Sequence, residues 1–150
     1  MSRPLPGREG ILALVPHQGP MCLWDAVEAW DATWIRLRAH SHRDPAHPLR
    51  ARGRLPALAL CEYGAQAMAV HGGLLAAGSG GRAAAGVLVA LRAVELAVTR
   101  IDDLGGALEG EARLLAAGQA SQQYEFRIHH DGRLLASGRA AAMLGGALPG

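Results

Sequence analysis

The sequence predicts an α+β fold in which an antiparallel sheet wraps around one long central helix. Residues 57–77 form a proline-free run of small and long aliphatic side chains, which favours a helix that is apolar nearly all round and therefore buried. Both flanks of this run carry the alternating apolar and polar residues of half-buried strands. With 150 residues, half of them apolar, the chain is expected to form a single domain over 1–150.

The segment before the helix is predicted to contain two strands and a loop. Residues 11–15 form a short apolar run, and a turn follows at residues 18–20. Residues 21–30 and 33–40 are expected to be strands, because β-forming side chains there alternate with polar ones. Residues 40–54 are polar, basic and proline-containing, which is typical of a long loop.

Four strands are predicted after the helix. The glycines of residues 78–81 end the helix; they follow a helix instead of a strand, so they indicate a linker and not a phosphate-binding loop. Asp131-Gly132 is the signal of a type I′ hairpin turn. The expected strands cover residues 86–98, 108–115, 124–129 and 133–144. A helix half wrapped by such a sheet needs a second protomer to complete its core, so we expect a dimer.

Composition and charge argue against several classes of protein. The net charge of +2 is too small to indicate nucleic-acid binding. Cys22 and Cys61 are far apart in apolar surroundings, so we expect reduced core residues and no disulfide or metal site. The chain has no signal-type or membrane-spanning apolar run and no metal-ligand spacing, so we expect a cytoplasmic protein that binds no membrane and no metal.

Glu62 and Gln66 are the candidate polar residues of the predicted helix. They are four residues apart, hence on one face, and they stand among apolar side chains. Burial of a carboxylate raises its pKa toward the range that is useful for acid–base chemistry. Free N–H groups in the first turn of the helix could bind a carbonyl oxygen. The alternative is a structural glutamate that caps a loop or forms an interface ion pair.

Two histidines are candidate partners of Glu62. His47 lies in the polar loop fifteen residues before Glu62, and His17 lies in a Pro-His-containing segment before the first strand. The other five are expected to have no catalytic role: His40 and His42 are solvated, His71 is satisfied in the core or an interface, and His129 and His130 are on the surface.

Residues 36–54 form the one basic stretch, with six arginines opposed only by Asp44. It is either a solvated loop or a landing surface for an acidic partner or a phosphate. Aromatic residues that could stack on bases are missing beyond Trp34. An acidic carrier protein with a phosphopantetheine arm therefore fits better than a nucleic acid.

Two motifs resemble those of the hotdog-fold 3-hydroxyacyl-acyl-carrier-protein dehydratases. Residues 16–25, P-H-Q-G-P-M-C-L-W-D, match the P-H-x-x-P-(M/F)-x-L-x-D segment of that family. The spacings from Pro56 to Glu62 and from Glu62 to Gln66 equal those of its central-helix motif, M-P-G-V-L-x-x-E-x-M-A-Q. The chain resembles this family over nearly its whole length, and it is similar to the branch associated with aryl-polyene gene clusters.

The resemblance implies a hotdog fold and the dehydration of 3-hydroxyacyl thioesters carried on acyl carrier protein, without a cofactor. Glu62 would be the catalytic carboxylate, a histidine would remove the α-proton, and Pro56, Ala57 and Gln66 would bind the substrate. The family also implies a homodimer or higher oligomer, or a heterodimer with a related hotdog subunit. The histidine and the glutamate of one site then come from different protomers.

The loop departs from the family pattern. The catalytic histidine of the family stands fourteen residues before the glutamate, where this chain has Pro48, and the H-F-P-G motif is replaced by H-P-L-R at residues 47–50. The sequence leaves three possibilities for the base: His47, His17, or no competent histidine in this chain. Two other functions remain open, namely an acyl thioesterase and a non-catalytic partner subunit of a hotdog dehydratase.

Overall fold

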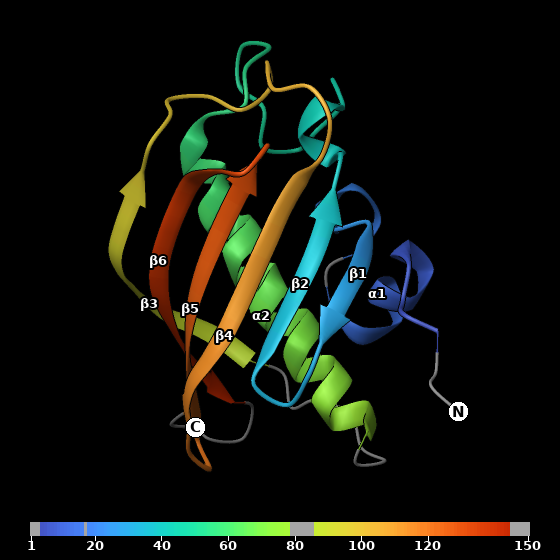
Figure 1. The fold of residues 1–150 in the computed structure, drawn as a ribbon, viewed down its shortest axis with the longest axis vertical. Coiled ribbons are helices and arrows are strands. Elements are labelled where there is room, and N and C mark those ends of the chain that lie inside the picture. The colour runs from blue at the N-terminus through green and yellow to red at the C-terminus, as the bar shows by residue number, and fades with distance from the viewer. Residues whose placement is uncertain (1–3, 17, 79–85, 145–150) are drawn as a thin grey trace.

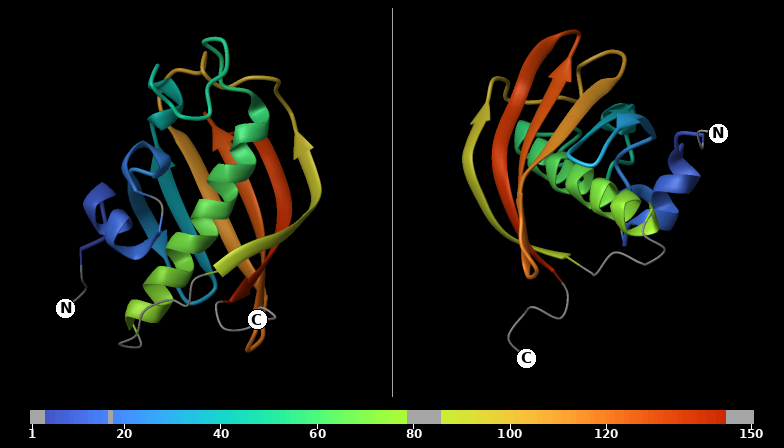
Figure 2. Two further views of the ribbon diagram at one scale, coloured as in Figure 1. Left: turned by 180° about the vertical axis from the view of Figure 1, so that it is seen from behind. Right: turned by 60° about the horizontal axis from the view of Figure 1, so that its bottom comes forward.

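A six-stranded antiparallel sheet curves around one long helix in the computed structural model, which describes residues 4–16, 18–78 and 86–144 (Figure 1). The sheet order is β1-β2-β4-β5-β6-β3. The strands are β1 (Ala26–Trp30), β2 (Trp34–Ala39), β3 (Gly86–Leu96), β4 (Leu108–Ala117), β5 (Ser121–His130) and β6 (Arg133–Leu144). The long helix is α2 (Leu60–Gly78), which crosses the concave face of the sheet (Figure 2). This is the hotdog fold that the sequence predicts.

The alternation of side chains along the strands places the core between the sheet and α2. On β5, Tyr124, Phe126 and Ile128 are fully buried, whereas the side chain of Arg127 is exposed. The β5–β6 turn has positive φ at both Asp131 (50°) and Gly132 (77°), which confirms the type I′ hairpin. Strand pairing therefore follows the periodicity that the sequence displays.

Gly64 allows α2 to lie directly on the sheet. A Cβ atom at this position would come within 2.6 Å of the Phe126 ring of β5. The ring thus occupies the space that any larger residue would need. A glycine that weakens the helix locally is compensated by close packing between helix and sheet.

Residues 21–25 do not form the strand that the sequence predicts, because β1 begins only at Ala26. Cys22, Leu23 and Trp24 are all buried, which consecutive residues of a strand with one solvent face cannot be. They are held by side-chain and main-chain groups of α2, because Leu23 N–H donates to Gln66 (2.9 Å) and Trp24 Nε1–H donates to the Tyr63 carbonyl (2.9 Å).

The structure also contains short helices, and the two edge strands of the sheet, β1 and β3, differ in whether other residues cover them. The short helices are α1 (Arg8–Leu14), η1 (Gly19–Met21), η2 (Ser41–Arg43) and η3 (Ala57–Ala59). The N-terminal segment covers β1, because Gly7 bridges Ala26 and Val27 N–H donates to the Pro6 carbonyl. In the described part of the chain, no strand pairs with the outer edge of β3.

Cys22 and Cys61 are free and buried, as predicted. Among the helices that the structure describes, none is both long and apolar enough to span a membrane.

Substitution of Gly64 by alanine is expected to destabilise the fold relative to the same change at Gly72. Both changes gain about 1 kcal/mol of helix propensity. Only the Cβ at 64 meets the Phe126 ring, whereas a Cβ at Gly72 has nothing within 4 Å. Overpacking should therefore place Gly64→Ala about 1–3 kcal/mol below Gly72→Ala in unfolding free energy. Urea unfolding of the two variants measures this difference, and equal stabilities would contradict the packing.

Candidate active site

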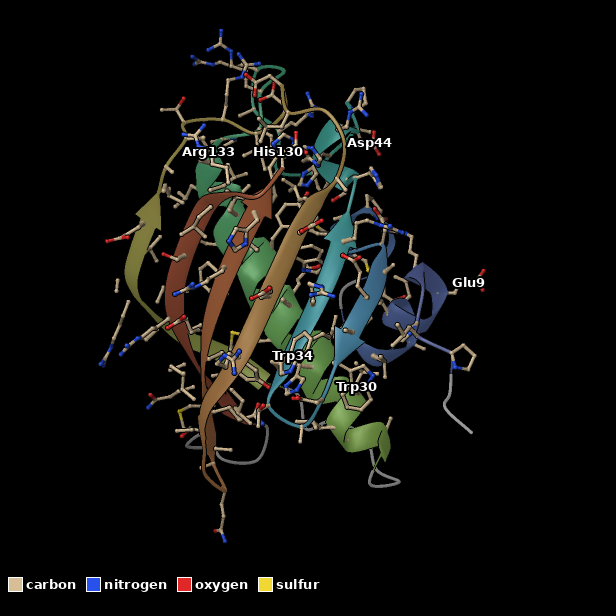
Figure 3. All side chains as sticks on the ribbon, viewed as in Figure 1. Glu9, Trp30, Trp34, Asp44, His130 and Arg133 are labelled. Carbon is tan, nitrogen blue, oxygen red and sulfur yellow. The ribbon has the colours of Figure 1, made fainter. Side chains whose placement is uncertain are left out.

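The loop that carries His47 lies at the end of the sheet where Asp44 and His130 are found, away from Trp30 and Trp34 (Figure 3). The His47 ring is only 5% exposed. Its Nε2 lies 3.2 Å from the Tyr63 hydroxyl, and its Nδ1 accepts a hydrogen bond from Leu49 N–H (3.0 Å). Burial and the nearby Arg50 lower the pKa of His47 below its ordinary value, so the imidazole is neutral at pH 7.

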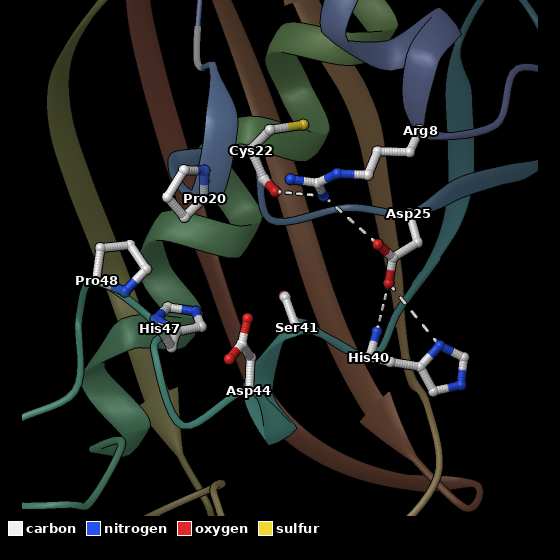
Figure 4. Close-up of a pocket in the computed structure, with 9 residues that line it drawn as sticks. All are labelled: Arg8, Pro20, Cys22, Asp25, His40, Ser41, Asp44, His47 and Pro48. Atoms are coloured by element: carbon white, nitrogen blue, oxygen red, sulfur yellow. Dashed lines mark hydrogen bonds and ion pairs between the residues drawn. The ribbon is translucent and has the colours of Figure 1, made fainter.

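A hollow of about 340 Å³ opens beside this loop (Figure 4). Its lining residues are Arg8, Pro20, Cys22, Asp25, His40, Ser41, Asp44, His47 and Pro48. The Arg8 guanidinium is held by the main chain, because it donates to the carbonyls of Cys22 and Gly19, both at 2.8 Å. Although carboxylates and imidazoles share this lining, the described residues include no group of three or more potential ligands arranged to hold a metal ion.

Glu62 and Gln66 lie on one face of α2, as predicted, and contact each other. Gln66 Nε2–H donates to Glu62 Oε1 (3.1 Å) and to the Met21 carbonyl (2.7 Å), and Gln66 Oε1 accepts from Leu23 N–H (2.9 Å). Gln66 is 2% exposed, so these bonds satisfy a buried amide. The amide therefore fixes the position of the Glu62 carboxylate relative to residues 21–23.

Glu62 is half-buried, which differs from the predicted burial among apolar side chains. Two residues correspond to about 200° around a helix, so Glu62 projects away from Gly64, which faces the sheet. The sheet of the same protomer therefore does not enclose the carboxylate. In this structure the hydrogen bonds of the Gln66 amide are made to groups of the chain itself. Contact between Gln66 and a substrate therefore stays a prediction.

The first turn of the central helix is anchored by the β3–β4 connection. Leu55 N–H donates to Asp102 Oδ1 (2.8 Å), and Ala57 N–H donates to the Thr99 carbonyl (3.0 Å). The Arg100 side chain and Leu55 N–H hold the pKa of Asp102 well below its usual range. Because its N–H is engaged, Ala57 is not poised to bind a carbonyl oxygen in this arrangement. Leu58, the next residue, is 67% exposed. Substrate binding by Pro56 and Ala57 stays a prediction.

The other histidines are placed as follows. His17 lies outside the described residues. His40 is exposed, as predicted, with Nδ1 3.8 Å from Asp25 Oδ2. The prediction for His42 is wrong: this residue is fully buried, because its Nε2 bonds to the Leu104 carbonyl (3.0 Å) and ties η2 to the β3–β4 connection. His71 is buried and satisfied, as predicted, by Tyr124 and the Asp31 carbonyl.

Sequence reasoning missed Tyr63 and Ser41, which both belong to the surroundings of His47. The Tyr63 side chain is fully buried, and its hydroxyl lies 2.6 Å from Ser41 Oγ. A signal was available for Tyr63, since a tyrosine in an apolar helix needs a polar partner for its hydroxyl. Nothing in the sequence indicates that Ser41 is that partner, because it lies twenty-two residues away along the chain.

Replacement of Gln66 by alanine is expected to lower the unfolding free energy. Leu23 N–H and the Met21 carbonyl would lose their partner, and a buried group such as Leu23 N–H costs about 1–3 kcal/mol when it is left unsatisfied. Gln123→Ala on an exposed part of β5 is the matched control and should change stability by less than about 0.5 kcal/mol. Chemical denaturation measures both values, and equal stability of the two variants would contradict the role given to the amide.

Comparison with known proteins places this chain among proteins of the hotdog fold. The chain is similar to a chain of the dehydratase heterocomplex ApeI:P from Xenorhabdus doucetiae, with 26% identity and a TM-score of 0.81. The match covers 89% of this chain and 90% of that one. A hypothetical thioesterase with coenzyme A from Streptococcus pneumoniae shares the fold at 12% identity and a TM-score of 0.57, covering 79% of this chain and 83% of that one.

A third solved structure, a putative thioesterase related to phenylacetic acid degradation from Ralstonia eutropha, has 19% identity and a TM-score of 0.59, with 79% and 83% of the two chains covered. No curated protein matches the sequence significantly. The model of one family, described as ApeP-like, ApeP dehydratase, matches residues 10–144. Because that match spans nearly the whole described fold, including the helix that carries Glu62 and Gln66, the chain belongs to the ApeP-like dehydratase family.

Proposed function

We propose that the protein acts in the dehydration of 3-hydroxyacyl thioesters carried on an acyl carrier protein. The observation that carries this proposal is the Glu62 carboxylate, held by the Gln66 amide close to the first turn of α2. Membership of a dehydratase family supports the type of reaction. The preserved spacing between Pro56, Glu62 and Gln66 supports the carboxylate as the group that acts on the substrate.

Glu62 would act as the general acid in this reaction. A base takes the proton from the α-carbon, the C–O bond at the β-carbon breaks, and Glu62 gives its proton to the departing hydroxyl, which leaves as water. A double bond then joins the α- and β-carbons. The thioester acidifies the α-carbon, and an N–H group of η3 at the exposed Leu58 would stabilise the developing negative charge on the carbonyl oxygen.

The catalytic assembly would contain at least two hotdog subunits. The edge of β1 is covered by residues of the same chain, so β3 offers the edge at which a second subunit could extend the sheet. Leu91 and Leu96 of β3 are each 39% exposed and would be buried by such pairing. The similar ApeI:P structure is a heterocomplex, which supports a related hotdog subunit as partner beside a second copy of this chain.

A tight turn at residues 51–54 would form part of the docking surface for the carrier protein. Ala51 and Arg54 exchange two main-chain hydrogen bonds (2.8 and 3.0 Å), and Arg52 (φ 55°) and Gly53 (φ 75°) form the turn between them. Arg52 and Arg54 are exposed, immediately before the segment that leads into the first turn of α2. An acidic carrier bound there would direct its phosphopantetheine arm toward that turn.

The variant Glu62→Gln should lose about 10²–10⁴-fold in dehydration rate while it folds normally, because it cannot donate the proton. Glu111→Gln on the exposed face of β4 is the control and should retain the wild-type rate. The assay follows 3-hydroxyacyl- and enoyl-carrier protein by mass spectrometry, with thioester hydrolysis measured in the same samples. It should be run on the chain alone and together with a related hotdog subunit.

Dehydration at the wild-type rate by Glu62→Gln would make Glu62 structural and refute the mechanism. Hydrolysis without dehydration would instead identify a thioesterase. Retained dehydration in an assembly whose other subunit holds all the required groups would identify this chain as a non-catalytic partner.

The double variant Arg52→Ala/Arg54→Ala should raise KM for carrier-bound substrate on the order of 5–10-fold and leave kcat unchanged, because charges at a docking rim contribute modestly to binding. The matched control is Arg36→Ala/Arg38→Ala on the exposed face of β2. A short pantetheine thioester, which carries no protein, should be turned over equally by all variants. The difference in KM should shrink at high salt, and an unchanged KM would exclude this surface.

A further inference from the structure

Four hydrogen bonds connect the main chain at Leu49 to the main chain at Leu23 through three side chains. Leu49 N–H donates to His47 Nδ1 (3.0 Å), and at the other end the Ser41 hydroxyl donates to the Leu23 carbonyl (2.7 Å). A main-chain N–H can only donate and a carbonyl can only accept. The two ends therefore fix the direction of every bond between them.

The two central bonds follow from these ends. Ser41 has a single hydroxyl proton, which it gives to Leu23, so the Tyr63 hydroxyl donates to Ser41 Oγ (2.6 Å). The Tyr63 oxygen then accepts from His47 Nε2–H (3.2 Å). This arrangement holds His47 as a neutral imidazole with its proton on Nε2.

Burial keeps the charge state of this chain of bonds fixed. His47 is 5% exposed and Tyr63 is fully buried, with their ring centroids 6.1 Å apart. Desolvation lowers the pKa of His47 and raises that of Tyr63, so both side chains are neutral around pH 7.

A general base needs a free lone pair directed at the substrate. In His47, the lone pair on Nδ1 accepts a hydrogen bond from Leu49 N–H, and Nε2 carries a hydrogen that it donates to the Tyr63 oxygen. The chain of bonds also ends in two main-chain groups that do not titrate, so it cannot pass a proton onward. The geometry therefore holds the ring in place and leaves it without the function of a base.

We infer that His47, Tyr63 and Ser41 are positioning residues that form a lock between the loop of residues 40–54 and α2, and that the base acting with Glu62 is a group other than His47. This inference rests on the proposed dehydration.

The lock reaches Glu62 through one residue, Leu23. The Leu23 carbonyl accepts from Ser41 at the end of the lock, and Leu23 N–H donates to Gln66, whose amide also donates to Glu62. A shift of the loop would therefore move the segment that sets the Glu62 carboxylate. Loss of the lock should alter substrate binding and the placement of the acid, without removal of a reacting group.

The test compares His47→Ala, Tyr63→Phe and the double variant within the assembly of this chain and a related hotdog subunit. A lock predicts similar losses in the two single variants, on the order of 10-fold in kcat/KM and mainly through KM, and a double variant no worse than either, because all three changes break the same chain of bonds. His47→Gln, which keeps a donor near Tyr63, should recover most of the activity.

A base at His47 predicts a different pattern, and that pattern would overturn the inference. The kcat of His47→Ala and of His47→Gln would then fall about 10²–10⁴-fold, and the acidic limb of their pH–rate profiles would disappear. Tyr63→Phe would keep its kcat and the acidic limb. Loss of activity in Glu62→Gln tests the proposed function separately, since it does not depend on His47.

Tyr124→Phe is the matched control. Tyr124 on β5 and His71 on α2 form a second buried tyrosine–histidine pair, with 2.6 Å between Oη and Nδ1, and the second nitrogen of His71 bonds to the Asp31 carbonyl instead of a residue of the lock. This variant should lose stability and keep the wild-type KM.

A further measurement needs no turnover. Nitrogen NMR of the His47 imidazole should show a neutral ring with the proton on Nε2 at pH 7, and a charged ring or a proton on Nδ1 would refute the lock.

Discussion

The buried amide of Gln66 is the interaction on which the arrangement of the site depends. It satisfies the buried Leu23 N–H and the carbonyl of half-buried Met21, and it contacts Glu62 one turn away on the same helix. A shift of α2 by one residue would leave the buried Gln66 amide and Leu23 N–H unpaired, which costs far more than a small loss of packing. The amide thereby fixes the register between the helix and the N-terminal segment, and with it the position of the carboxylate.

Two buried histidine–tyrosine pairs supply further polar contacts on α2, beside those of Glu62 and Gln66. His47 and Tyr63 lie near its first turn, and His71 and Tyr124 lie near its second half. Burial lowers the pKa of both histidines, so each pair is neutral and its polar atoms are matched by hydrogen bonds. Such pairs fix the rotation of α2 about its own axis, because aliphatic contacts alone allow many rotations of the helix with comparable energy.

The sequence predicted the order of strands and helix well because those signals are local. Glycine clusters, prolines and period-two alternation depend only on neighbouring residues, so the helix over residues 57–77 and the hairpin at Asp131-Gly132 were recognised. The errors lie where distant groups decide. Residues 22–24 are drawn to α2 instead of pairing in the sheet, and His42 is buried by its bond to Leu104.

The sequence by itself determined the fold class and the pair Glu62 and Gln66, since a separation of four residues places two side chains on one face of any α-helix. Only the tertiary structure decided the state of His47. Its tautomer depends on Tyr63, which is sixteen residues from His47 along the chain, and on Ser41, which is twenty-two residues from Tyr63. Whether an imidazole is free to take a proton depends on which donors and acceptors folding brings to its two nitrogens, and no local pattern in the sequence contains that information.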